Sequence, residues 1–301
     1  MMEWAKKTLE KVELSRKERL HQPAPLPTET EAESILNNFH PDYSGKERTI
    51  VVGPNAGNQK FPLELADLLE ADSFLPTSHT TVPDIETDVL ILGGGGAGAS
   101  AALALEGSGF NIHLATKLRL GDSNTVMAEG GIQAALAAND SPRRHFADAM
   151  VGGHGENETG LLRILCENGP KSISWLSQLG CLFDRNSDGT FRLRGGGGTS
   201  VSRILACRDY TGLEIMRVLK DAVRLSSTNI LEEHIAVELF DDGNSTITGA
   251  VLYDRKSARL VNVSARAVIL ATGGSGQLRL QNFPTSNHVG ATGDGLVMAY
   301  R

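Results

Sequence analysis

The chain has 301 residues and 40% of them are hydrophobic, which suffices for one large domain with a substantial core or for two smaller ones. The net charge is −7 and no block of basic residues occurs in the sequence, so nucleic acid and anionic membrane surfaces are poor candidates for partners. No apolar run is long enough to span a bilayer, and the charged N-terminus lacks the apolar core of a signal peptide. We therefore expect a globular cytoplasmic protein without direct membrane insertion.

The cysteine content argues against several kinds of site. The sequence has three cysteines, Cys166, Cys181 and Cys207, and no CxxC pair. The odd number and the wide spacing argue against a disulfide framework, a zinc site or an iron–sulfur cluster within this chain. We expect buried or incidental thiols and no bound metal.

Residues 1–86 are expected to form a small α/β extension with a linker, and residues 87–301 a separate main domain. The extension contains two charged helical segments, a proline-rich linker at 22–27, a short strand at 49–52 and a helix at 61–70. The glycine-containing loop between that strand and that helix indicates a plain turn, because it lacks the Lys-Ser/Thr pair of a phosphate-binding loop.

A strand, a glycine-rich turn and a helix are predicted in succession from Asp88 onward. The apolar run 88–92 suits a buried parallel strand, and Gly93, Gly95 and Gly98 then fall at the GxGxxG spacing. Gly93 permits a sharp turn, Gly95 lets the backbone approach a pyrophosphate, and Gly98 lets the helix pack on the strand. Because backbone N–H groups at a helix N-terminus bind anions, this motif predicts a bound dinucleotide.

The second strand of this unit indicates which dinucleotide is bound. In an NAD-type fold that strand ends at an acidic residue, about twenty residues after the glycines, which binds the ribose 2′-OH. Here the strand 111–117 ends at Thr116 and Lys117, and the nearest acid, Asp122, lies in the next loop. The sequence therefore favours a flavin over NAD.

The middle of the chain is predicted to be helical, and the last third is predicted to be mainly β-structure. A helical stretch at 132–179 is followed by a glycine-rich loop and a helix at 211–225. Four strands follow, with a hairpin turn at Asp241, and a last helix at 290–301 has no terminating residue. The predicted strands are 230–240, 247–253, 260–263 and 267–271. We expect the chain to be the N-terminal part of a longer protein.

Three further segments offer groups that a flavin would need. The loop 121–131 carries short hydroxyl and amide side chains and ends in two glycines, which let a flat ring approach the backbone. The strand 268–271 stops before Gly273, where a nucleotide would lie over the carboxyl end of the sheet. Asp294, at the start of the last helix, suits the hydroxyl groups of a ribityl chain. Together with the glycine turn, these segments predict an FAD site.

In this order the motifs resemble the fumarate reductase/succinate dehydrogenase flavoprotein family, which includes L-aspartate oxidase. The resemblance runs from Asp88 to Arg301 and is supported by the segments 145–148, 175–184 and 203–212. It implies a Rossmann-like α/β fold of the glutathione-reductase type, with a parallel sheet, a β-meander and FAD in an extended form.

The resemblance also assigns roles in cofactor binding. The glycine turn would hold the pyrophosphate, the end of the second strand would lie beside the adenosine, and the backbone near residue 235 would face the adenine. The loop 121–131 would line the flavin and diphosphate, and the last helix would bind near the ribityl part. The cofactor-binding residues so implied are Gly93, Gly95, Ala97, Gly98, Thr116, Lys117, Ser123, Asn124, Thr125, Ala128, Gly130, Gly131, Ile235, Ala236, Ala271, Thr272, Gly273 and Asp294.

Asn124 departs from the family pattern. In the membrane-bound respiratory members this position is a histidine that bonds covalently to the flavin, and an asparagine amide cannot form that bond. We therefore expect noncovalent FAD. The residues that bind the dicarboxylate and move the proton follow the last helix in the family, so no catalytic residue is assigned in this chain.

The expected function is that of the FAD-binding part of an oxidoreductase, with hydride transfer between a small dicarboxylate or amino-acid substrate and FAD. Two alternatives stay open at this point. One is an FAD-carrying electron-transfer subunit of a larger complex, with an iron–sulfur or other electron-transfer protein as partner. The other is a pyridine-nucleotide–FAD oxidoreductase, which would need a redox-active cysteine pair and a second GxGxxG unit.

Overall fold

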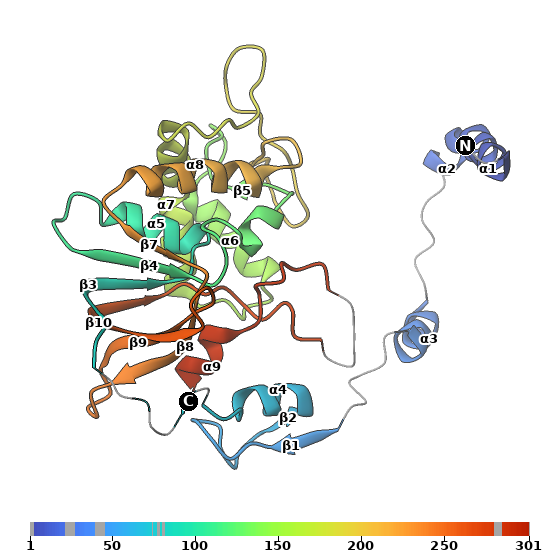
Figure 1. Ribbon diagram of the computed structural model, residues 1–301. Coiled ribbons are helices and arrows are strands. Elements are labelled where there is room, and N and C mark those ends of the chain that lie inside the picture. The colour runs from blue at the N-terminus through green and yellow to red at the C-terminus, as the bar shows by residue number, and fades with distance from the viewer. Residues whose placement is uncertain are drawn as a thin grey trace. The chain divides into compact units, whose positions relative to one another are not determined.

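The computed structural model divides the chain into two compact units, residues 1–46 and residues 47–301. The first unit holds three charged helices, and the second holds the sheets and the glycine-rich motif (Figure 1). The proline-rich linker predicted at 22–27 lies outside the described residues. The structure describes residues 3–21, 28–39, 46–73, 75–76, 79, 82–279 and 285–300.

The helices of the first unit are short and polar. The third begins with a reciprocal cap, in which the Glu31 carboxylate accepts from the Thr28 N–H at 2.9 Å and the Thr28 hydroxyl accepts from the Glu31 N–H at 3.3 Å. The backbone bond from Thr28 also lowers the pKa of Glu31. These helices are α1 (Glu3–Leu14), α2 (Arg16–His21) and α3 (Glu29–Phe39).

A six-stranded sheet organises the second unit, with strand order β7-β4-β3-β10-β9-β8. Strands β7, β4, β3 and β10 run parallel, whereas β9 and β8 continue from β10 as an antiparallel meander. The expected α/β fold with a parallel sheet and a β-meander is confirmed. The bounds are β3 (Ile85–Leu92), β4 (Ile112–Thr116), β7 (Asn229–Glu232), β8 (His234–Asp241), β9 (Ile247–Asp254) and β10 (Arg259–Leu270).

The central strand β3 is buried on both faces, which is why its sequence is a continuous apolar run. Val89 and Ile91 pack into the larger core, which includes residues of helices α5 (Gly96–Ala104) and α8 (Thr211–Leu225). Leu90 and Leu92 point the other way, into a smaller core shared with the meander strands. In Figure 1 α5 and α8 lie on the same side of the sheet. The parallel strands are thereby fixed from both sides.

The helical stretch expected at 132–179 is interrupted. It consists of β5 (Ile132–Gln133), α6 (Pro142–Gly152) and α7 (Thr159–Gln178). The Glu158 carboxylate caps α7 by accepting from the N–H groups of Gly160 and Leu161. Pro170 lies inside α7.

Two strand predictions also differ from the structure. The expected strand 230–240 is split into β7 and β8 at Glu233, whose φ of 61° turns the chain from the parallel sheet into the meander. The expected strands 260–263 and 267–271 are one strand, β10, because its backbone pairs with β9 on one side and β3 on the other. The hairpin predicted at Asp241 is confirmed, since it joins β8 to β9.

The remaining elements of the second unit are short. Strands β1 and β2 form a hairpin that packs against α4. The buried side chains of this small core are Ile50, Ala66 and Leu69. None of the helices in the described ranges has the length and hydropathy needed to cross a bilayer. The bounds are β1 (Glu47–Thr49), β2 (Lys60–Pro62), α4 (Leu63–Leu69), η1 (Asn124–Met127), β6 (Ile204–Leu205) and α9 (Asp294–Tyr300).

Candidate cofactor site

A pocket of about 380 Å³ lies at the carboxyl ends of the parallel strands, where open α/β sheets bind their ligands. Segments that are far apart in the sequence form its walls: the glycine turn after β3, the end of β4, the loop into η1, the end of β10 and the start of α9. The predicted site residues that line it are Gly93, Gly95, Ala97, Thr116, Lys117, Ser123, Asn124, Thr125, Ala236, Ala271, Thr272, Gly273 and Asp294.

The other predicted residues lie outside the lining of this pocket. Gly98 packs beneath the turn, Ile235 is paired with Tyr253 in the meander, and Gly131 lines a neighbouring cavity. The carbonyl of Ala128 accepts a hydrogen bond from the Gly212 N–H at 2.7 Å. The outlying site residues are Gly98, Ala128, Gly130, Gly131 and Ile235, and their contact with a cofactor stays a prediction.

The glycine turn has the geometry that a pyrophosphate requires. Gly93 has φ of 120°, and a Cβ there would lie 2.2 Å from the Ala271 carbonyl oxygen, so only glycine fits. Helix α5 begins at Gly96 with Gly95 as its N-cap, and the Gly96 N–H donates to the Thr125 hydroxyl at 3.2 Å. The first N–H groups of a helix have no partners within the helix. The turn is therefore a cradle of backbone donors aimed at the pocket, which fits an anionic group.

Two charged side chains meet across the pocket. The Lys117 ammonium donates to the Asp294 carboxylate at 2.6 Å and to the Thr292 hydroxyl at 2.6 Å. Lys117 directly follows β4 and Asp294 begins α9, so this ion pair joins the predicted adenosine side of the site to its predicted ribityl side. Both groups are only partly exposed. The carboxylate of Asp294 is thus held in one orientation toward the pocket.

Asn124 is also held by the segment before α9. Its Oδ1 accepts from the His288 N–H at 2.9 Å, and the His288 Nδ1 in turn accepts from the Gly290 N–H at 3.1 Å. His288 lines the pocket as well. The amide of Asn124 therefore serves as a hydrogen-bonding group that links two walls of the site.

Several lining residues were not among the predicted ones. Gly94 is needed because a Cβ there would lie 2.9 Å from the Thr116 side chain. The run of four glycines in the sequence could have indicated Gly94 as a site residue. No comparable signal exists for His234, which reaches the pocket because the chain turns at Glu233. The additional lining residues are Leu92, Gly94, Gly96, Ala115, Leu118, Asp122, His234, Leu270, Gly274, His288, Gly290 and Ala291.

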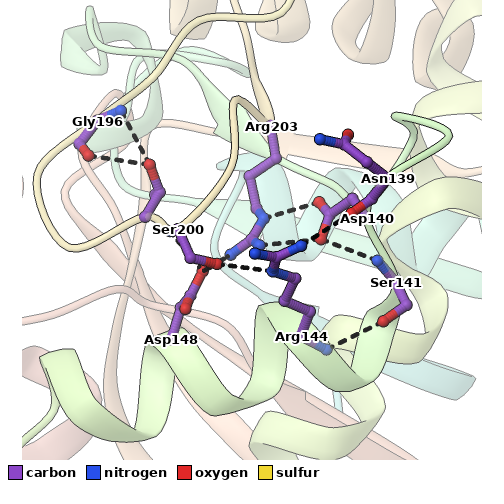
Figure 2. Close-up of polar contacts among 9 residues, drawn as sticks. Asn139, Asp140, Ser141, Arg144, Asp148, Gly196, Ser200 and Arg203 are labelled. Atoms are coloured by element: carbon purple, nitrogen blue, oxygen red, sulfur yellow. Dashed lines mark hydrogen bonds and ion pairs between the residues drawn. The ribbon is translucent and has the colours of Figure 1, made fainter.

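A buried ion-pair cluster lies outside this pocket (Figure 2). The Arg203 side chain is 0% exposed and donates from Nε and Nη2 to both oxygens of Asp140 at 2.9 Å, and from Nη1 to Asp148 at 2.6 Å. Asp148 also accepts from the N–H and the hydroxyl of Ser200, each at 2.8 Å. Arg144 donates to the same Ser200 hydroxyl at 3.0 Å. The cluster fastens the glycine-rich loop before β6 to helix α6.

Burial shifts the pKa values of several other side chains in the direction that favours their neutral forms. Burial, followed by the charge of Arg203, lowers the pKa of His145. Cys166, Cys181 and Cys207 are buried free thiols, and burial is the main cause that raises the pKa of Cys181 to about 12. In the part of the chain that the structure describes, no three His, Cys, Asp or Glu side chains are grouped to hold a metal ion.

Asp148 makes the stability of the fold depend on pH. Its pKa is lowered from 3.8 to about 2, chiefly by the Ser200 N–H, with the Ser200 hydroxyl and Arg203 acting in the same direction against burial. A lowered folded-state pKa contributes stability above the unfolded value, which is lost as the pH falls through the folded one. We expect urea unfolding to show a steeper loss of stability between pH 4 and pH 2 in the wild type than in Asp148→Asn. Equal slopes in the two proteins would contradict this assignment.

Comparison with known proteins identifies the class. The family model described as the FAD binding domain matches residues 88–301, so the chain belongs to the FAD-binding-domain family. The cofactor of this family is FAD, which confirms the preference for a flavin over NAD.

Individual relatives are FAD-dependent oxidoreductases. The chain is 42% identical over 219 residues to an uncharacterized FAD-dependent oxidoreductase of Methanocaldococcus jannaschii, covering 72% of this chain and 39% of the relative. It is 37% identical over 221 residues to the L-aspartate oxidase of Streptomyces coelicolor, covering 72% and 38%. A solved E. coli quinol fumarate reductase chain superposes with a TM-score of 0.68 at 31% identity, covering 72% of this chain and 37% of that one. These matches confirm the resemblance and the expected fold, and the chain spans under two fifths of each relative.

Proposed function

We propose that this chain is the cofactor-holding part of an oxidoreductase that transfers a hydride between a small dicarboxylate or amino-acid substrate and noncovalent FAD. The observation that carries the proposal is the convergence of the four predicted segments on one pocket at the carboxyl ends of the parallel strands. The relationship to L-aspartate oxidase and fumarate reductase supports the substrate class. We also propose residues 87–301 as the cofactor-binding domain and residues 1–86 as its extension.

Each wall of the pocket has a distinct part in binding. The N–H groups at the start of α5 would bind the pyrophosphate, and Lys117 would lie beside the adenosine. Ser123 and Thr125 would donate to polar edges of the cofactor, and Asp294 would accept from ribityl hydroxyls. When bound, FAD supplies the ring that accepts or donates a hydride, and this chain orients that ring.

The proposed site predicts selective binding of FAD. We expect the chain, freed of flavin, to quench the fluorescence of added FAD with saturation, and NAD at equal concentration to leave that titration unchanged. The physical reason is that β4 ends at Thr116 and has no acidic residue for the NAD ribose. Linear, nonsaturating fluorescence during the FAD titration would contradict the proposal.

The same site predicts that the bond to FAD is noncovalent. Asn124 offers an amide whose Oδ1 is already engaged by the His288 N–H. After acid precipitation of flavin-loaded protein, we expect the yellow colour in the supernatant. Colour that stays in the pellet would overturn this expectation, and its loss in His288→Ala would then identify that imidazole as the point of attachment.

An electron partner forms the second part of the proposal. A hydride that enters the cofactor must leave as electrons before the next turnover, so a second reactant such as oxygen, a quinone or an iron–sulfur protein is required. The quinol fumarate reductase relationship supports a partner of the electron-transfer kind.

A further inference from the structure

The hairpin β1–β2 and helix α4, residues 47–70, lie outside the region that the FAD-binding family model matches. They nevertheless belong to the same compact unit as the cofactor pocket. In Figure 1 they lie beside α9, the short helix whose first residue is Asp294. We propose that residues 47–70 are a positioning element for the cofactor, which acts by fixing α9 and so the carboxylate of Asp294. This inference rests on the proposed role of Asp294 in binding FAD.

The contact between the two parts is close and specific. Tyr300, at the end of α9, packs against the small core of Ile50, Ala66 and Leu69. Its ring lies directly on the loop between β1 and β2, because a Cβ placed on Gly53 would lie 2.3 Å from the Tyr300 Cε1 atom. A side chain at position 53 would therefore displace the aromatic ring.

A second contact reaches the other end of α9. The Leu68 side chain of α4 lies 3.8 Å from the position that a Cβ on Gly293 would occupy. Gly293 immediately precedes Asp294, so the segment contacts α9 at both of its ends. Between these contacts Val297 and Met298 are buried. Residues 47–70 thus approach α9 at Tyr300 and beside Gly293.

Residues 47–70 are themselves anchored. Arg48 pairs with Asp67 at 2.9 Å and with Glu70, which ties the hairpin to α4. The segment that leads into β3 is fixed to the meander, since the Ser73 hydroxyl donates to Glu238 at 2.8 Å. The His79 Nε2 lies 2.7 Å from the Asn262 Oδ1. The element can therefore transmit its position to α9.

Two glycines of the same loop provide a matched pair of variants. Gly53 and Gly57 have φ of 73° and 76°, so alanine imposes similar backbone strain at both. Only at position 53 would the added Cβ meet Tyr300, because nothing lies within 4 Å of a Cβ at position 57. In the full-length chain, we expect Gly53→Ala to weaken FAD binding by about ten-fold, as loss of a supporting contact does, and Gly57→Ala to leave it within about two-fold.

A double-mutant cycle separates positioning from general destabilisation. If residues 47–70 act through Asp294, Gly53→Ala should have no further effect on the FAD dissociation constant in an Asp294→Ala background. Tyr300 gives a second readout, because its buried hydroxyl has no hydrogen-bond partner among the described residues. We expect Tyr300→Phe to retain wild-type FAD affinity and Tyr300→Ala to lose it as Gly53→Ala does.

The outcomes separate the inference from the proposed function. Equal FAD affinity in Gly53→Ala and Gly57→Ala, or additive effects of Gly53→Ala and Asp294→Ala, would overturn the positioning role while the proposed function stood. Failure of the wild-type chain to bind FAD would overturn both. Thermal unfolding without FAD, measured on each variant, shows that the compared proteins are folded at the titration temperature.

Discussion

Replacing Arg203 with alanine is expected to lower the free energy of unfolding by about 3 to 5 kcal/mol, the range for removing one partner of a buried ion pair. The guanidinium is fully buried and satisfies Asp140 and Asp148 together. Its loss leaves two carboxylates without their shared cation, and the Asp140 side chain is 0% exposed, so water does not solvate that carboxylate in its place. Urea unfolding monitored by circular dichroism measures the difference.

An exposed arginine of the same chain gives the control. Arg224 is 50% exposed at its side chain and pairs with Glu232 at 3.4 Å, so Arg224→Ala should cost under about 1 kcal/mol. A triple variant of Arg203, Asp140 and Asp148 to apolar residues should recover much of the loss, because replacing a whole buried cluster is often neutral. If Arg203→Ala and Arg224→Ala lowered the free energy of unfolding by similar amounts, burial of the ion pair would not determine its contribution to stability.

Many residues that line the candidate pocket could be predicted from the sequence because their signals are local. At Gly93 and Gly98 the spacing follows from close backbone contacts that leave no room for a Cβ. The loop at Ser123 and the start of α9 at Asp294 also carry short polar groups in contiguous runs. In each case a few adjacent residues must be small or polar for the chain to bind a cofactor, so a short sequence pattern indicates them.

Contacts between residues that are far apart in the sequence could not be predicted from such local patterns. Arg203 and Asp140 are 63 residues apart, and nothing in the composition around them shows that the arginine is buried. The Lys117–Asp294 pair joins residues 177 apart. Likewise the packing of Tyr300 on Gly53 depends on where α4 folds back, and the turn at Glu233 uses a left-handed conformation at a residue type that gives no turn signal.

Gly98→Ala is expected to weaken cofactor binding strongly. A Cβ at position 98 would lie 1.8 Å from the Gly93 carbonyl oxygen, which belongs to the turn that we propose for the pyrophosphate. Because that contact is between two backbone segments, the helix must move away from β3, at a cost of about 3 kcal/mol in stability. The first N–H groups of α5 move with it, so FAD affinity should fall by about 100-fold, as for a displacement of about 1 Å.

Gly96→Ala is the matched substitution, in the same helix and two residues earlier. Its Cβ would lie 3.2 Å from the Thr125 hydroxyl, a side chain that can shift by a few tenths of an ångström, so stability should stay within about 1 kcal/mol of the wild type. Urea unfolding and FAD fluorescence titration of both variants decide the matter. Equal stability and equal FAD affinity in Gly98→Ala and Gly96→Ala would contradict the close packing of helix α5 against the Gly93 carbonyl. Gly98 does not line the pocket. We therefore expect it to affect FAD binding indirectly, by setting the distance between helix α5 and strand β3.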